Sequence, residues 1–168
     1  MTEEQVTQPD LSELLGDQSQ AINFPDGLIG LDEWHQFAIV SHPAGGPLQL
    51  LQSLEDARVS FIVTDPYRVE TDYRLKLTKA DAAALQYAGG AGEVPEDNLD
   101  ITAVCIVSVQ EEPFLASVNL LGPLVINWQS GLGRQVIQSD SNYSPRYIIA
   151  DSNSAPSVEA VSPDKEGA

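Results

Sequence analysis

The sequence predicts a mainly β protein, an antiparallel β-barrel-like single domain with one or two short helices. Short runs of β-branched and aliphatic residues recur along the chain, separated by Pro, Gly or Asp, which is the pattern of strands joined by turns. Only one segment has a helical pattern with a clear start. The chain has 168 residues, of which 42% are hydrophobic, and this is enough for the core of one domain.

The first part of the domain reads as a turn followed by three strands. Residues 24–28 read Phe-Pro-Asp-Gly-Leu, a turn signal because Pro fixes φ and Gly accepts positive φ. Asp65 and Pro66 end the last of the three strands. These strands are expected at residues 37–40, 48–54 and 59–64.

The helix is expected to begin at Thr78. Thr78 and Asp81 have capping-box spacing, with Asp in place of the usual Glu. Apolar side chains up to Ala88 then lie along one side at helical spacing. The Gly89–Gly90 pair is expected to end this helix.

An acidic loop over residues 93–100 leads into an apolar strand over residues 101–109. This strand contains Cys105, the only cysteine of the chain, so no internal disulfide can form. A lone cysteine in an apolar strand is usually an inert core residue. We therefore expect Cys105 to be buried, with Val104 and Ile106 on the opposite face.

Residues 117–137 predict a binding surface carried on three consecutive strands. Two aliphatic runs flank Gly122–Pro123 and a third follows residues 130–133, so the segment reads as a meander with tight turns. Its few polar residues include no general base, nucleophile or metal-ligand set. This composition indicates binding rather than catalysis.

The chain is expected to divide into three parts. Residues 1–20 form a polar, acidic lead with a weak helical stripe of leucines. Residues 21–150 form the folded domain. Residues 151–168 are rich in Ser, Pro, Ala and acidic residues and are expected to be a disordered tail.

The charge balance argues against partners that are themselves anionic. The formal net charge is −17; lead and tail carry −5 and −3, so the folded domain retains −9. Such a field repels phosphate backbones and anionic membrane surfaces and attracts basic proteins. The beginning of the chain lacks the basic and apolar regions of a signal peptide, and no run is long enough to span a membrane. A cytoplasmic location, with no direct nucleic-acid or membrane binding, is expected.

Five segments, in this order, resemble the flagellar assembly factor FliW family. Together they span roughly residues 22–147, and no single segment is specific. The resemblance implies a small β-barrel-like protein that is not an enzyme and needs no cofactor. The segments are Phe24–Gly30 (FPDGLIG), Leu51–Asp56 (LQSLED), Phe61–Tyr67 (FIVTDPY), Val118–Asn127 (VNLLGPLVIN) and Gly133–Tyr143 (GRQVIQSDSNY).

The resemblance also implies two protein partners. Family members bind flagellin and the RNA-binding translational regulator CsrA. When unassembled flagellin is scarce, the factor holds CsrA away from flagellin mRNA; when flagellin accumulates, it occupies the factor and releases CsrA. A monomeric partner-switching regulator is therefore expected. The alternative is a flagellin-binding chaperone without a regulatory arm.

Acidic residues in two segments are candidates for contact with a basic regulator, and two asparagines in the VNLLGPLVIN segment are added to them. Each acid also fits a solvated loop charge, and each asparagine also fits a structural hydrogen bond at a sheet edge or bulge. Arg134 is expected to pair with an acidic neighbour, and Tyr143 and Tyr147 to cover the end of the barrel. The partner-binding candidates are Asp65, Glu70, Asp72, Glu93, Glu96, Asp97, Asp100, Asn119 and Asn127.

A hydrolase is a third, remoter alternative. His35 and His42 are the only histidines, and with Asp32, Glu33 and Cys105 they could in principle form a metal site or a Cys-His pair. Their spacing fits no ligand pattern. No catalytic, metal-binding or cofactor-binding residue is therefore assigned.

Overall fold

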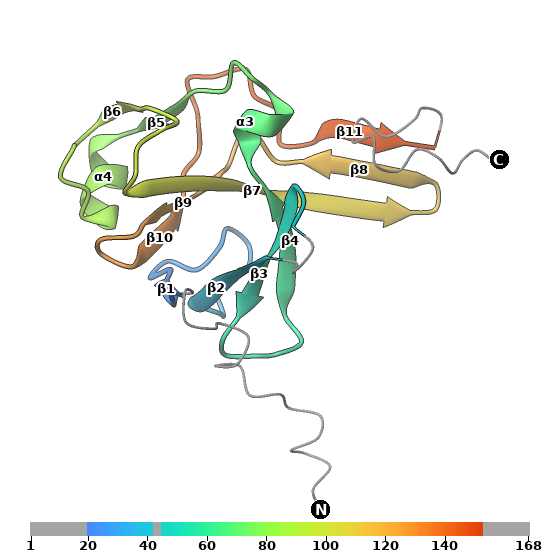
Figure 1. The fold of residues 1–168 in the computed structure, drawn as a ribbon, viewed down its shortest axis with the longest axis horizontal. Helices are drawn as coiled ribbons and strands as arrows, with labels where there is room; N and C mark the ends of the chain where they lie inside the picture. Colours follow the sequence, from blue (N-terminus) through green and yellow to red (C-terminus); the bar gives the residue numbers. More distant parts are fainter. Residues whose placement is uncertain (1–19, 42–44, 153–168) are drawn as a thin grey trace, which may run out of the picture.

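A closed barrel forms the centre of the molecule. The structure, a computed structural model, describes residues 20–41 and 45–152. Nine strands form one sheet in the order β11-β8-β7-β4-β3-β2-β1-β10-β9, and a further pairing of β9 with β7 closes the ring (Figure 1). The predicted fold class is thus confirmed. The strands are β1 (Ile22–Asn23), β2 (Gln36–Ser41), β3 (Leu48–Ser53), β4 (Ser60–Thr64), β7 (Ile101–Glu111), β8 (Phe114–Val118), β9 (Leu124–Asn127), β10 (Leu132–Gln135) and β11 (Tyr147–Asp151).

The pairing in the ring is antiparallel at every contact except one. β1 and β10 run parallel, and the Asn23 N–H donates to the Gly131 carbonyl at 2.8 Å. Outside the ring lie α3 (Pro66–Val69), α4 (Lys79–Leu85) and a small sheet of β5 (Leu75–Leu77) and β6 (Gly92–Val94). β8, β11 and residues 108–111 of β7 project from the barrel and are called the arm here (Figure 1).

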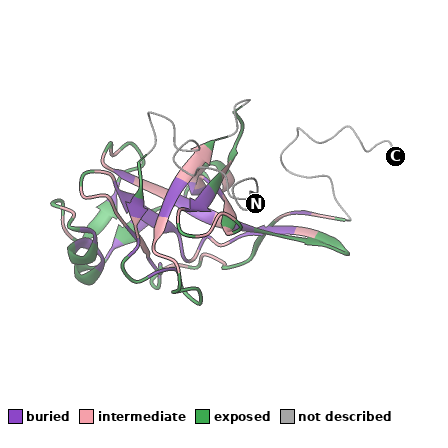
Figure 2. Cartoon of the chain, turned by 90° about the horizontal axis from the view of Figure 1, so that it is seen from below, coloured by how far each residue is buried: buried purple, intermediate pink, exposed green. Residues whose placement is uncertain are grey.

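Alternation along β7 builds two cores. Val104 and Ile106 pack in the barrel core, whereas Cys105 and Val107 face the opposite side, into an outer core. The outer core fills the space between the barrel wall and the layer of α4, β5 and β6. Figure 2 shows the buried segments in the barrel strands, while the far end of the arm and much of α4 are exposed. The expected burial of Cys105 is confirmed.

Two turn predictions are confirmed by hydrogen bonds. The Gly27 N–H donates to the Phe24 carbonyl at 2.9 Å, and Gly27 has a φ of 67°. At the start of α4, Thr78 accepts from the Asp81 N–H while the Asp81 carboxylate accepts from the Thr78 N–H, which is the expected capping box.

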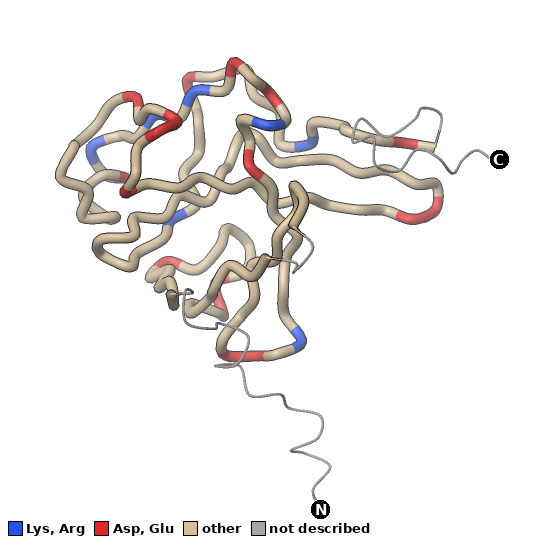
Figure 3. The backbone as a smooth tube through the Cα atoms, in the orientation of Figure 1, with Lys and Arg blue, Asp and Glu red and all other residues tan. Residues whose placement is uncertain are grey.

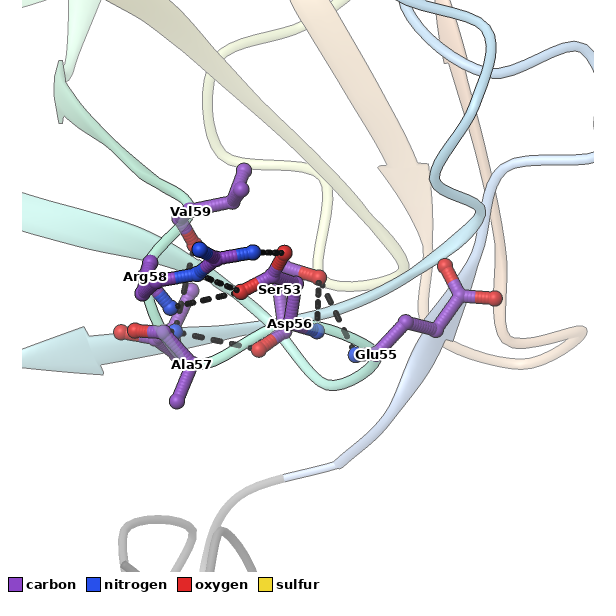
Figure 4. A network of polar contacts seen from close by, with 7 residues as sticks. Ser53, Glu55, Asp56, Ala57, Arg58 and Val59 are labelled. Atoms are coloured by element: carbon purple, nitrogen blue, oxygen red, sulfur yellow. Dashed lines mark hydrogen bonds and ion pairs between the residues drawn. The ribbon is translucent and has the colours of Figure 1, made fainter. Parts of the chain in front are cut away.

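The segment Leu51–Asp56 covers the end of β3 and the first part of the turn to β4 (Figure 4). The Ser53 hydroxyl accepts from the N–H groups of Glu55 and Asp56, and Asp56 pairs with Arg58 at 2.9 Å. The buried Gln52 amide donates to carbonyls across the turn. This segment of the family resemblance therefore has a structural role.

The helix prediction is wrong at its end. α4 ends at Leu85, before the Gly89–Gly90 pair, and Ala88 is exposed beyond it. Gln86 caps the helix in the left-handed conformation with a φ of 55°, and its N–H donates to the carbonyls of the preceding turn. Glycine normally favours this position, so a glutamine there carries no sequence signal.

The predicted meander over residues 117–137 is wrong in its first half. β9 and β10 form the expected hairpin, but β8 and β9 pair with successive stretches of β7 and run in the same direction. Gly122–Pro123 therefore lies in an excursion that does not reverse the chain. The Gly122 N–H donates to the Asn119 side chain at 2.9 Å within this excursion.

Neither Tyr143 nor Tyr147 covers an end of the barrel, which corrects that expectation. Tyr143 stacks on Tyr73 at a centroid distance of 4.5 Å and packs against the outer core. Tyr147 lies on β11 in the arm, opposite Val118. The ends of the chain predicted as lead and tail lie outside the described residues, apart from Gln20 and the last residues of β11 and its turn.

Replacing Gly133 with Ala is expected to lower the free energy of unfolding by about 2 kcal/mol, because overpacking a buried site costs about 1–3 kcal/mol. A Cβ at this position would lie 2.5 Å from Cζ of Phe24, which is fully buried and packed edge-on against Phe37. Urea unfolding measures the change. Adding Phe24→Leu should recover part of the loss, and strict additivity of the two changes would contradict the proposed clash.

Candidate functional site

The candidate site is built around Tyr67, in the first turn of α3. Asp65 caps this helix, its Oδ1 accepting from the Tyr67 N–H at 2.9 Å, and Pro66 occupies the first helical position. The sequence Asp-Pro-Tyr thus ends β4 and starts a short helix at once. The Tyr67 ring packs half-buried against the outer core, edge-on to Tyr73 at 5.6 Å.

Three of the predicted acids converge on Tyr67 from two distant segments. Burial, together with the negative charges of Glu96, Asp65 and Glu93, raises the pKa of Tyr67 to about 12. Tyr67, Asp65 and Glu96 also line one hollow of about 270 Å³. Figure 3 shows acidic positions around α3 and β6 and none along β2 and β3. We call Asp65, Glu93, Glu96 and the adjacent Asp97 the acidic surface.

The members of the acidic surface differ in how far they are already engaged. Asp65 caps α3, and Glu93, which lies on β6 rather than in a loop as expected, pairs with Arg74 at 3.1 Å. Glu96 and Asp97 are exposed and make no hydrogen bond or ion pair in the described part of the chain. These two carboxylates are therefore the most available for a cationic partner.

The remaining predicted acids have other surroundings. Glu70 ends α3, and its carboxylate accepts from the N–H of Asp72 at 3.2 Å. The Asp100 carboxylate accepts from the Gln129 amide at 3.2 Å, at the turn between β9 and β10. Among the described residues, none of these three acids contributes to the raised pKa of Tyr67 or lines its hollow. The acidic surface is thus smaller than the predicted set.

Both predicted asparagines hold the fold together by hydrogen bonds. Asn127 is 2% exposed, and its amide donates to the carbonyls of Leu85 and Gln86 at 2.9 and 3.3 Å, which satisfies the end of α4. The Asn119 side chain accepts from Gly122 in the excursion between β8 and β9. Of the two roles that the sequence left open, the hydrogen bonds support the structural one.

Arg134 clamps α4 to the barrel. Its guanidinium contacts Asp81 at 2.9 Å and Asp26 at 2.7 Å, joining β10 to α4 and to the first turn of the domain. The expected pairing with acidic neighbours is confirmed. Asp81 serves both this ion pair and the capping box of α4.

Of the residues considered for catalysis, His35 and Cys105 are engaged in the fold. The His35 Nδ1 donates to the Phe24 carbonyl at 2.9 Å, and His42 lies outside the described residues. Burial raises the pKa of the Cys105 thiol to about 12, the opposite of what a thiolate nucleophile needs. Across the described ranges, no three side chains of the His, Cys, Asp or Glu type gather as metal ligands.

Sequence reasoning missed Leu99, which is 94% exposed in the acidic loop. A single exposed leucine is ordinary on a protein surface, and this one lies in the same loop as Glu96 and Asp97. The available signal was a leucine whose immediate neighbours, Asn98 and Asp100, are both polar. In the described residues no helix is long and apolar enough to cross a membrane.

The molecule belongs to the class of small closed β-barrel domains, and its acidic surface lies in the layer outside the ring. Comparison with known proteins identifies the family. The family model described as FliW protein matches residues 5–149. This chain therefore belongs to the FliW family.

Individual relatives agree with this assignment. The flagellar assembly factor FliW of Clostridium beijerinckii is 35% identical over 131 residues, covering 78% of this chain and 87% of the relative. That of Natranaerobius thermophilus is 28% identical over 145 residues, covering 86% and 91%. A crystal structure of the flagellar assembly factor FliW superposes with a TM-score of 0.63 at 25% identity, covering 76% of this chain and 84% of the other.

Proposed function

We propose that this protein binds flagellin and holds the RNA-binding regulator CsrA, and that exchange between the two relieves repression of flagellin translation. Membership of the flagellar assembly factor family supports a role in flagellar assembly. The acidic surface supports the regulatory part of this proposal. A protein that binds RNA carries a basic face, and an acidic surface attracts such a face. It acts as a cytoplasmic monomer without enzymatic activity and without binding nucleic acid directly.

The proposed binding of CsrA rests on one observation: Asp65, Glu93 and Glu96 converge on Tyr67. Two acidic segments separated in the sequence contribute to one field, and Glu96 and Asp97 of this surface are exposed. A basic protein is steered toward such a field, while RNA is repelled by it. The acidic surface can therefore hold the regulator without itself binding the RNA that the regulator recognises.

Binding of purified flagellin and purified CsrA to the full chain tests the proposal directly. Both should bind, and flagellin should displace CsrA from the preformed complex. Binding of flagellin without CsrA would favour the alternative, a chaperone with no regulatory arm. Binding of neither partner would overturn both.

Association with CsrA is expected to slow by about tenfold or more as salt rises from roughly 0.02 to 0.5 M, because screening shortens the reach of exposed charges below about 10 Å. Dissociation should change less, since contacts at the centre of an interface are screened less than its rim. Stopped-flow measurement separates the two rates. Equal association rates at both salt concentrations would exclude steering by the acidic surface.

A further inference from the structure

A groove lies outside the acidic surface, between the segment of β5 and α4 and the chain that follows β10. It consists of two adjoining hollows of about 420 and 380 Å³, and Thr78 and Ile137 line both. Ile29 from the first turn of the domain lines the second hollow, and Tyr143 lines the first. Two segments that resemble the FliW family, Phe24–Gly30 and Gly133–Tyr143, thus meet here.

Aliphatic side chains stand exposed in the groove. Ile137 is 42% exposed between the two hollows and Ile29 is 63% exposed in the second. Exposed apolar side chains in a concave site are typical of a surface that a binding partner covers. Neither isoleucine lies in a sequence pattern that predicts an exposed side chain.

Basic residues of this acidic chain gather at the same place, together with the acids Asp26, Asp81, Glu93 and Asp140. Of the eight Lys and Arg residues of the chain, four lie in or beside the groove. Arg74 forms an ion pair with Glu93, and Arg134 forms ion pairs with Asp26 and Asp81. Lys76, in contrast, lines the first hollow and makes no ion pair in the described part of the chain, although Asp140 lines the same hollow. The four residues are Arg74, Lys76, Lys79 and Arg134.

Hydrogen bonds across the groove hold its walls in place. The Gln138 side chain accepts from the Lys76 N–H at 2.9 Å and donates to the Lys76 carbonyl at 3.0 Å. The Ile29 N–H donates to the Gln135 side chain at 2.9 Å. The groove is therefore preorganised, which lowers the entropic cost of binding. Because Gln138 occupies the backbone of Lys76, an occupant cannot add a strand to β5 there and must bind through its side chains.

We propose that this groove binds a peptide segment with two aliphatic side chains, which cover Ile137 and Ile29, and an acidic side chain, which reaches Lys76. The inference rests on the proposed function, in which flagellin is the partner left for this groove. The acids at this groove balance its basic residues, so a basic regulator is attracted to the acidic surface rather than to the groove. The groove and the acidic surface adjoin at the ion pair of Arg74 and Glu93, so the two partners interfere there and flagellin displaces CsrA.

The test titrates purified flagellin into the full chain and its variants Ile137→Ser and Lys76→Glu. Both changes are on exposed side chains, so thermal unfolding should stay near that of the original protein. Each variant should bind flagellin about tenfold more weakly, the effect of losing a contact worth about 1.4 kcal/mol. CsrA binding should be unchanged for Ile137→Ser.

Matched controls lie on the arm and its approach. Val109→Ser removes an aliphatic side chain that is 49% exposed, and Arg146→Glu makes the same charge change as Lys76→Glu. Both should retain flagellin binding. If the original protein binds flagellin and the two groove variants bind it equally well, the groove is wrong and the proposed function stands. If the original protein binds no flagellin, both fail.

Discussion

Replacing Cys105 with Asp is expected to lower the free energy of unfolding by about 4 kcal/mol or more, because an unpaired carboxylate must enter an apolar interior. Cys105 is fully buried in β7, among the side chains of the outer core. Burial already raises the pKa of its thiol to about 12, so this site disfavours any negative charge. Urea unfolding at neutral pH measures the loss.

The pH dependence separates the charge effect from a loss of packing. The buried Asp would have a raised pKa in the folded state, so the variant gains stability as pH falls toward the ordinary carboxyl pKa of about 3.9. The difference in free energy of unfolding between the variant and the original protein should therefore become smaller from pH 7 to pH 4. Cys105→Ala, which removes the sulfur without adding charge, should show no such narrowing. An equal gap at both pH values would refute the proposed cause.

The strands and cores could be predicted because they depend on alternation along the chain. Cys105 and its neighbours Val104 and Ile106 alternate between two apolar environments, and the sequence pattern contains that alternation directly. The capping box at Thr78 is equally local. What could not be predicted is which strand pairs with which, because pairing depends on residues far apart in the chain.

The excursion between β8 and β9 illustrates this limit. Gly122 and Pro123 indicate a turn, and a turn between two strands usually reverses the chain. Here the long strand β7 offers one edge to both neighbours, so β8 and β9 continue along it in the same direction. Local chemistry predicted an interruption, but only tertiary pairing determines the direction that follows.

The candidate site shows the same division. The sequence identified the acids, but their convergence on Tyr67 requires α3 and β6 to lie on the same side of the outer core. For Asn127 the sequence left both partner binding and a structural role open. The fold supports the structural role, because the Asn127 amide donates to a carbonyl at the end of α4. The exposure of Leu99 and Ile137 depends on what the fold leaves uncovered, and no local pattern contains that information.

Reversing the charge of both Glu96 and Asp97 to Lys is expected to weaken CsrA binding by about tenfold or more, since local charge pairs at an interface are worth about 1.5 kcal/mol upward. These two carboxylates are the exposed, unengaged members of the acidic surface. Their replacement should change stability by less than about 0.5 kcal/mol, as is usual for exposed side chains. Calorimetric titration with purified CsrA measures the affinity, and thermal unfolding checks the fold.

The matched control reverses Glu111 and Glu112, two adjacent exposed acids at the tip of the arm. Both double variants raise the net charge by the same amount, so they weaken long-range attraction for a basic partner to a similar extent. The difference between them isolates the local contribution of the acidic surface. Flagellin binding should be retained by both, because the groove around Ile137 uses neither pair. Equal CsrA affinities for the two double variants would remove Glu96 and Asp97 from the interface, and unfolding of the first would show that the loop is structural.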